Sequence, residues 1–157
     1  MEGKPVSRDP DRVRVRDDLE FLWLMERTEN GYACAAHNDD SLQREFIQSW
    51  DQVQQFYRSF DNSWWMKGIV LLFIAALRRA GYDRKLRAGN SLYSLILSRS
   101  RLHGLRAEQP FVAFEFRAVT MDLRFRERQA ETVSRVPIAL FGPVKKALAK
   151  LSARPLS

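Results

Sequence analysis

The chain has 157 residues, of which 45% are hydrophobic and 29% are charged. Both values are ordinary for a globular protein, which excludes disorder of the whole chain. A chain of this length buries roughly 68 to 70% of its unfolded surface on folding, so it can form a core without metals or disulfides. Its one cysteine, Cys34, excludes an intrachain disulfide and a zinc site made of several thiolates from one chain.

Residues 1–18 are polar, charged and proline-containing, and they lack the apolar segment of a secretory signal peptide. We expect them to form a flexible charged arm, followed by a single domain over residues 19–153. The lone cysteine suits a reducing compartment. The resulting prediction is a cytoplasmic protein with no cofactor and no metal.

The net charge of +7 is unevenly distributed along the chain. Residues 1–50 carry 7 Lys/Arg and 11 Asp/Glu, a net charge of −4, whereas residues 51–157 carry 19 and 8, a net charge of +11. Residues 78–106 alone hold eight basic residues and one acidic residue. Such asymmetry indicates either an anionic partner or an acidic first part that neutralises a basic second part within the molecule.

The most apolar stretch is residues 63–82, in which nine consecutive residues, 69–77, carry no polar group. A membrane-spanning helix needs roughly 20 apolar residues, and Lys67 and Arg78 leave only about half of that length. We therefore predict a central core helix and no membrane span. Gly81 is expected to end this helix. Its expected N-terminal caps are Asp61, Asn62 or Ser63.

Two further helices are predicted from apolar residues at helical spacing. Residues 41–60 follow a cluster of capping residues and carry the apolar positions Leu42, Phe46, Trp50, Val53, Tyr57 and Phe60 on one face. A short last helix begins near Pro143, a residue suited to a first helical turn. Its narrow apolar stripe consists of Val144, Leu148 and Leu151.

Alternating apolar residues predict the strands. Residues 19–26 and 32–36 flank a Thr-Glu-Asn-Gly turn and are typical of a hairpin. Residues 82–90 predict a basic loop, residues 91–99 a strand, and residues 101–110 a second loop. Within residues 111–128 the apolar positions change parity near Ala118, which requires a bulge, a bend or a turn. Residues 131–140 predict a last strand, which Pro137 confines to a sheet edge or a bulge.

Strands and helices that do not strictly alternate indicate an α+β fold. We therefore predict one domain with a mostly antiparallel sheet packed on the central apolar helix. The amphipathic helix at residues 41–60 and the short C-terminal helix complete this prediction.

Arginines on the strand after Ala118 are the first candidate site. If the apolar residues of this strand face the core, Arg124, Arg126 and Arg128 face the other side, and Arg135 joins them from the next strand. Such a face can bind phosphates or carboxylates. The alternative, which is the commoner situation on antiparallel strands, is a solvated outer face. Asp122, Glu127 and Glu131 would then be the partners of the arginines.

The loop at residues 98–106 is the second candidate. It combines hydroxyl groups with Arg99, Arg101, Arg106 and His103 around Gly104, a composition compatible with an anion-binding concavity. It lacks the spacing of a phosphate-binding P-loop. An exposed basic turn is the simpler interpretation.

Specific nucleic-acid recognition has little support in the sequence. Proteins that bind single strands usually interleave aromatic platforms with basic groups, and here Phe114, Phe116 and Phe125 fall on the expected core parity. No helix-turn-helix, zinc-finger or RNA-recognition motif is evident. Contact with a nucleic-acid backbone is still compatible with the charge.

Catalytic residues are poorly supported. Cys34 and His37 would face opposite sides of a strand, so a buried thiol is the better interpretation of the cysteine. A pocket built from Glu115, His103, Trp64 and Trp65 is the alternative that we retain. Because Trp64 and Trp65 are adjacent on a helix and point about 100° apart, we expect one of them to be exposed.

The sequence thus supports three hypotheses of different classes. The first is a non-enzymatic binding or adaptor protein that contacts an acidic protein surface or a nucleic-acid backbone through its arginine-rich surface. The second is a small-ligand or enzymatic pocket between sheet and helices. The third is a structural homodimer built with an exposed tryptophan and an edge strand.

Overall fold

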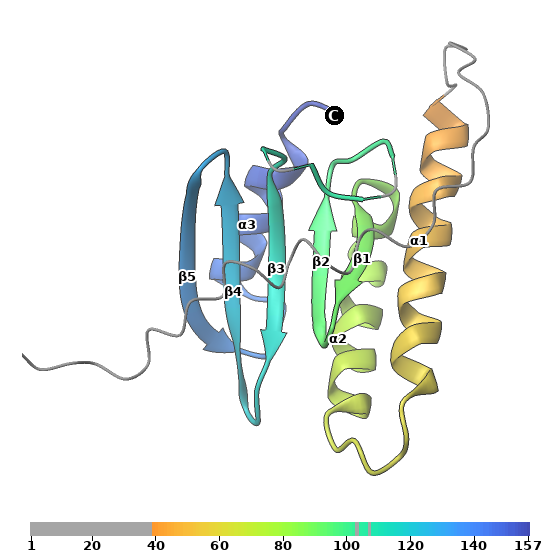
Figure 1. Cartoon of the computed structure of the whole chain (residues 1–157), viewed down its shortest axis with the longest axis vertical. Helices are drawn as coiled ribbons and strands as arrows, with labels where there is room; N and C mark the ends of the chain where they lie inside the picture. The colour runs from red at the N-terminus through yellow and green to blue at the C-terminus, as the bar shows by residue number, and fades with distance from the viewer. Residues whose placement is uncertain (1–38, 103, 107) are drawn as a thin grey trace, which may run out of the picture. The chain divides into compact units, whose positions relative to one another are not determined.

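The computed structural model describes residues 39–157 apart from residues 103 and 107 (Figure 1). The predicted arm at residues 1–18, the hairpin at residues 19–36, Cys34 and His37 lie outside the described residues. The predicted α+β fold with an antiparallel sheet is confirmed. Its elements are α1 (Asp39–Ser59), α2 (Lys67–Arg79), the 3-10 turn η1 (Tyr82–Arg84), β1 (Arg87–Ser91), β2 (Ser94–Ser98), β3 (Phe111–Phe116), β4 (Thr120–Glu127), β5 (Ala130–Pro137) and α3 (Gly142–Ser152).

The five strands form an antiparallel meander in the order β1-β2-β3-β4-β5. Two-residue loops join β1 to β2 and β4 to β5, and a three-residue loop joins β3 to β4, whereas residues 99–110 form a long loop between β2 and β3. Leu92 and Arg128, the first residues of two of these short loops, have φ angles of 51° and 55°. Positive φ at this position is typical of tight hairpin turns, whose twist matches that of the strands. Figure 1 shows α2 and α3 behind the sheet.

The core lies between the sheet and the helices. Alternate residues of the strands, including Leu97, Val112 and Met121, pack with Val70, Ile74 and Leu77 of α2 and with Val144, Leu148 and Leu151 of α3. Phe73 of α2 meets Phe114 of β3 edge to face, with ring centroids 5.1 Å apart. On the opposite face of the sheet, Ile96, Phe111 and Ala113 are also buried, so that face is not purely polar.

The central helix is shorter than expected at its start. α2 begins at Lys67 after Met66, and none of the three predicted capping side chains caps it. Asp61 instead accepts a hydrogen bond from the Ser63 backbone N–H at 3.0 Å, within a separate turn that precedes the helix. The predicted stop is confirmed, because Gly81 follows α2 with a φ angle of 80°. Leu72 is exposed, so α2 is not covered on every side.

α1 covers one edge of the sheet. Its apolar face is buried as predicted, except that Phe60 lies beyond its end and is only partly buried. The Ala88 N–H, on the open side of β1, donates to the Ser49 Oγ at 2.9 Å. The Trp50 Nε1 donates to the Leu86 carbonyl at 2.8 Å. These side-chain bonds satisfy backbone groups that an edge strand otherwise leaves unpaired.

Residues 87–91 form strand β1, so the loop predicted at residues 82–90 is wrong over that part. The guanidinium of Arg87 is buried against α1, where it lies over the Phe46 ring and pairs with Glu45 at 2.9 Å. These contacts come from residues about 40 positions away in the chain. They override the weak strand preference of the local sequence Arg-Ala-Gly-Asn.

The strand predicted at residues 91–99 is shorter than expected, because Ser91 ends β1, residues 92–93 form a turn, and β2 spans Ser94–Ser98. The other expectations for the second half hold with small changes. The parity change is a turn at Ala118 and Val119, closed by a hydrogen bond from the Arg117 N–H to the Thr120 carbonyl at 2.8 Å. β5 is an edge strand that ends at Pro137, as that residue predicts. The strand does not extend to residue 140 as expected. α3 buries its predicted stripe.

Candidate anion-binding end of the sheet

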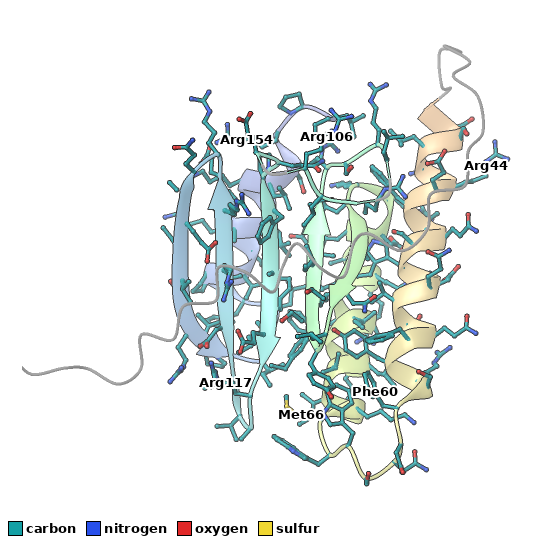
Figure 2. The ribbon with its side chains drawn as sticks, viewed as in Figure 1. Arg44, Phe60, Met66, Arg106, Arg117 and Arg154 are labelled. Carbon is teal, nitrogen blue, oxygen red and sulfur yellow. The ribbon has the colours of Figure 1, made fainter. Side chains whose placement is uncertain are left out.

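Basic residues gather at one end of the fold. The end of α2 with η1, the loop at residues 99–110, the β4–β5 turn and the tail after α3 all lie at this end (Figure 1). Figure 2 places Arg106 and Arg154 there, and Arg117, Phe60 and Met66 at the opposite end. We call this region the basic end. Its residues are Arg84, Lys85, Arg99, Arg101, Arg106, Arg128 and Arg154.

A buried arginine organises the loop at residues 99–110. The Arg87 Nε donates to the Ser100 carbonyl at 3.0 Å, and its Nη2 donates to the Arg101 carbonyl at 2.6 Å. The Ser100 hydroxyl in turn donates to the Leu102 carbonyl at 2.6 Å. Arg87 and Ser100 are both buried. The guanidinium therefore fixes the start of the loop by binding its carbonyl groups.

The tail after α3 is bound to the same loop. The Arg101 N–H donates to the Ser157 carbonyl at 2.7 Å, and the Ser157 N–H donates to the Arg99 carbonyl at 3.2 Å. The buried Gln109 side chain donates to the Ser157 hydroxyl at 2.7 Å. These bonds hold Arg99 and Arg101 against the tail.

A groove of about 680 Å³ opens at the basic end. This volume is in the usual range for small-molecule sites. Arg99 borders it from the end of β2, Arg128 from the β4–β5 turn, and Arg154 from the tail. Glu108, Glu127 and Ser157 also line it. The fold therefore brings three guanidiniums from separate segments to one concave surface.

The acidic groups of the groove neutralise only part of this charge. Glu127 pairs with Lys150 at 2.8 Å and with Arg154. Arg99 donates to the carbonyls of Arg154 and Lys85, each at 3.0 Å, and these neutral groups leave its charge uncompensated. Burial lowers the pKa of Arg99, but an arginine side chain stays protonated in proteins.

Four of the predicted site residues meet at the basic end. They are Arg99, Arg101, Arg106 and Arg128. Within the described part of the chain, no carboxylate forms an ion pair with any of them. β4 ends at Glu127, so Arg128 lies in the β4–β5 turn at the basic end. The expectation that Arg128 continues the row of arginines along the strand is therefore wrong.

The other predicted arginines lie on the sheet face opposite α2 and α3, which we call the outer face. Arg124 contacts Glu131 at 3.2 Å and Glu115 at 3.7 Å. Arg135 contacts Asp122 at 2.8 Å. Arg126 lies over the Phe111 ring, 5.6 Å from its centroid. The two guanidiniums of Arg124 and Arg135 thus have the carboxylate partners expected of a solvated outer face.

Asp122 is the most strongly held carboxylate on that face. It is 7% exposed and contacts Arg135 and Arg117, the latter at 2.7 Å. Its pKa is below the ordinary value, chiefly because of the hydrogen bond from Arg135 and with a further contribution from Arg117, while burial acts in the opposite direction. The outer face is an alternating array of opposite charges rather than an open row of cations.

The residues of the predicted pocket do not share partners. Glu115 is partly exposed and pairs with Arg117 and Arg124 on the outer face. Trp64 stacks on Tyr57 with ring centroids 5.9 Å apart. Trp65 is 59% exposed, which confirms that one of the two tryptophans faces solvent. His103 lies outside the described residues.

The comparisons with known proteins add no assignment. No protein-family model, curated protein or solved structure matches the chain. Over residues 39–157, leaving out 103 and 107, no helix is both long and apolar enough to cross a membrane. The same residues contain no cluster of His, Cys, Asp or Glu side chains that could hold a metal ion.

No pattern in the sequence indicated the contribution of the tail. Residues 154–157 lie beyond the predicted domain boundary at residue 153, yet Arg154 and Ser157 line the groove. A basic residue close to the end of a chain is too common to mark a site. The pairing of Glu127 with Lys150 and Arg154 depends on how α3 packs, which periodicity does not specify.

Proposed function

We propose that this chain is a non-enzymatic binding protein whose basic end contacts the phosphate backbone of a nucleic acid. Four arginines without ion-pair partners among the described residues converge there from the long loop and the β4–β5 turn. This convergence is the single observation that carries the proposal. Arginine suits it because its planar guanidinium binds phosphate through two parallel hydrogen bonds.

The chemistry of the basic end favours backbone contact over base reading. The predicted site residues there are arginines. The aromatic cluster of Trp64 with Tyr57, Phe60 and Tyr93 lies beside the α1–α2 connection at the opposite end, and Tyr82 of η1 packs against the core. Without aromatic platforms for stacking, attraction to phosphates supplies the binding energy. The expected binding is independent of base sequence.

The outer face is the weaker site for the same partner. Arg124 and Arg135 already contact Glu131 and Asp122. A phosphate that replaced those carboxylates would leave Asp122, which is buried, without its cations, at a cost similar to that of breaking a buried ion pair. We therefore assign the anionic partner to the basic end.

The test is a set of charge-matched variants. Arg101, Arg106 and Arg128 are changed together to Gln, because their side chains are exposed and make no ion pair in the described part of the chain. The control changes Arg58, Lys145 and Lys146 to Gln, which removes the same charge at the opposite end, where α1 ends and α3 begins. Binding to a random-sequence single-stranded oligonucleotide is measured for both at low salt.

We expect at least about tenfold weaker binding for the basic-end variant and little change for the control. Equal losses in both variants would show attraction to net charge alone and would contradict the proposal. The same titration with a polyglutamate peptide separates the two kinds of anionic partner. Tight binding of the peptide with no binding of the oligonucleotide would assign the basic end to an acidic protein instead.

A further inference from the structure

The two edges of the sheet differ in how they are covered by the described part of the chain. α1 covers the edge of β1, where Ser49 binds the outward N–H of Ala88. No helix or strand in the described part of the chain pairs with the outer edge of β5. Residues 130–135 of β5 are exposed, and Val133 at its centre is 55% exposed. A long exposed edge of this kind is a template for pairing with another strand.

The register identifies which backbone groups of β5 point outward. Glu127 and Ala130 flank the two-residue loop between β4 and β5 and are paired across it, so they form a hydrogen-bonded pair. Bonded and non-bonded pairs alternate along an antiparallel ladder. The backbone groups of Glu131, Val133 and Arg135 therefore point away from β4. Pro137 shares this parity, so its missing N–H falls on the open edge, where proline is tolerated.

These outward groups are self-complementary. When two β5 strands pair antiparallel about a two-fold axis at Val133, Val133 meets Val133 of the second copy and Glu131 meets Arg135. Each of the three outward residues then exchanges both of its backbone hydrogen bonds with the second copy. Glu131 and Arg135 lie on the outer face and have opposite charges, which favours directly opposed pairs.

Neighbouring registers are worse. An axis at Arg135 places Pro137 of each copy opposite Val133 of the other, and two backbone hydrogen bonds are lost because proline has no N–H. An axis at Glu131 places two Glu131 carboxylates opposite each other, and like charges in that position are destabilising. The axis at Val133 is the one that opposes the three outward residues only to one another and places opposite charges face to face.

The same arrangement continues the charge pattern of the outer face. Glu131 contacts Arg124 and Arg135 contacts Asp122 within one chain. Pairing about Val133 therefore joins the two arrays into one that alternates in sign across both molecules. We propose that the chain forms a symmetric dimer through β5, in which two five-stranded sheets become one continuous antiparallel sheet with its two-fold axis at Val133.

Cysteine substitution tests the register. Residues opposite each other in a bonded antiparallel pair have Cα atoms about 5.5 Å apart, within the range that a disulfide spans. In a Cys34→Ser background, Val133→Cys is expected to form an interchain disulfide under mild oxidation with glutathione. Glu131→Cys is not expected to form an interchain disulfide. In this register the two Glu131 positions are offset by four residues along the paired strands, roughly 13 Å.

The matched control for accessibility is Val119→Cys, because Val119 is the more exposed valine and lies in the β3–β4 turn. We expect the Val133→Cys disulfide to form at least about tenfold faster than the Val119→Cys disulfide, since pairing raises the effective concentration of the thiols. Equal rates would overturn the proposed dimer. Faster cross-linking of Glu131→Cys than of Val133→Cys would overturn the register.

Val133→Pro tests the same edge without a new thiol. Its N–H points away from β4, so proline at this position removes an intermolecular hydrogen bond and leaves the β4–β5 ladder in place. Sedimentation velocity is expected to show a concentration-dependent dimer for the wild type and a monomer for Val133→Pro, with an unchanged far-UV circular dichroism spectrum. A wild type that stays monomeric at all concentrations would overturn the proposal.

This inference is independent of the proposed nucleic-acid contact. The oligonucleotide titration depends on Arg101, Arg106 and Arg128, whereas the cross-linking depends on Val133. Failure of either experiment leaves the other interpretation standing. A wild-type monomer that still binds the oligonucleotide, for example, would remove the dimer alone.

Discussion

Ala88 donates its backbone N–H to the Ser49 Oγ at 2.9 Å, and this bond fastens the outer edge of β1 to α1. Both residues are buried, and they lie 39 positions apart in the chain. Ser49 also donates to the Phe46 carbonyl at 2.6 Å within its own helix. One hydroxyl therefore links helix and sheet at the edge that α1 covers.

Ser49→Ala tests the contribution of this link to stability. The change leaves the buried Ala88 N–H without a partner, which costs about 1 to 3 kcal/mol. Ser59→Ala is the matched control, because Ser59 makes the same kind of bond to the Phe56 carbonyl at 2.7 Å on the exposed face of α1. We expect urea unfolding to show the loss for Ser49→Ala and a change within about 0.5 kcal/mol for Ser59→Ala. Equal effects would contradict the assigned role of Ser49.

The adjacent tryptophans are expected to differ in their effect on stability. Trp64 packs with Tyr57, Phe60 and Tyr93, whereas Trp65 is 59% exposed. Truncation of a packed aromatic costs about 3 to 5 kcal/mol when it is fully buried, and Trp64 is only partly buried, so we expect about 2 kcal/mol for Trp64→Ala. Trp65→Ala should change the free energy of unfolding by less than about 1 kcal/mol. A larger loss for Trp65→Ala in thermal unfolding would show that the packing is assigned to the wrong ring.

Asp122 makes stability depend on acid pH. Its folded-state pKa is below the ordinary value of 3.8, first because of the hydrogen bond from Arg135. A carboxylate with a depressed pKa stabilises the fold above its unfolded pKa, and this contribution is lost as the pH falls through the folded pKa. We expect Asp122→Asn to be less stable than the wild type by about 1 to 2 kcal/mol at neutral pH.

The difference between Asp122→Asn and the wild type should shrink as the pH falls below about 4, because the wild-type carboxyl then becomes protonated too. Asp51→Asn is the control, since Asp51 pairs with Arg78 but its side chain is 61% exposed. Its effect should be small at every pH. Unfolding curves for wild type and Asp122→Asn that stay parallel down to about pH 2 would refute the role given to Asp122.

Arg87 is expected to position the loop at residues 99–110 through its bonds to the carbonyls of Ser100 and Arg101. Lysine keeps the charge but cannot reproduce the fork of donors. We therefore expect Arg87→Lys to be cut faster by trypsin within this loop than the wild type. Arg84→Lys is the control, because Arg84 is exposed and makes no ion pair in the described part of the chain. Identical cleavage rates for the two variants would mean that Arg87 does not hold the loop.

Regular patterns in the sequence predicted much of the fold. The helical spacing of residues 41–60 predicted the buried face of α1, and the parity change near Ala118 predicted the β3–β4 turn. Pro137 predicted an edge strand. Strand β1 was missed because contacts with Ser49 and Trp50, far away in the chain, decide its structure. Periodicity within a short window carries no information about such contacts.

The candidate site was less predictable than the fold. The sequence singled out Arg99, Arg101, Arg106 and Arg128 as basic residues of two different regions. These arginines lie at one end of the fold because of the order of the strands in the meander, and because β4 ends at Glu127, directly before Arg128. The carboxylate partners of Arg124 and Arg135 belong to the commoner of the two interpretations of the outer face, a solvated face with paired charges.

The most direct test of the proposed function is the salt dependence of oligonucleotide binding. For a single strand, the slope of log K against log salt concentration is about −0.7 for each phosphate neutralised. If Arg101, Arg106 and Arg128 contact phosphates, their joint replacement by Gln should make the slope less negative by roughly 2. The control variant Arg58, Lys145 and Lys146 to Gln should keep the wild-type slope. A slope that is the same in the wild type and the basic-end variant would contradict the assignment of the nucleic-acid backbone to this end of the sheet.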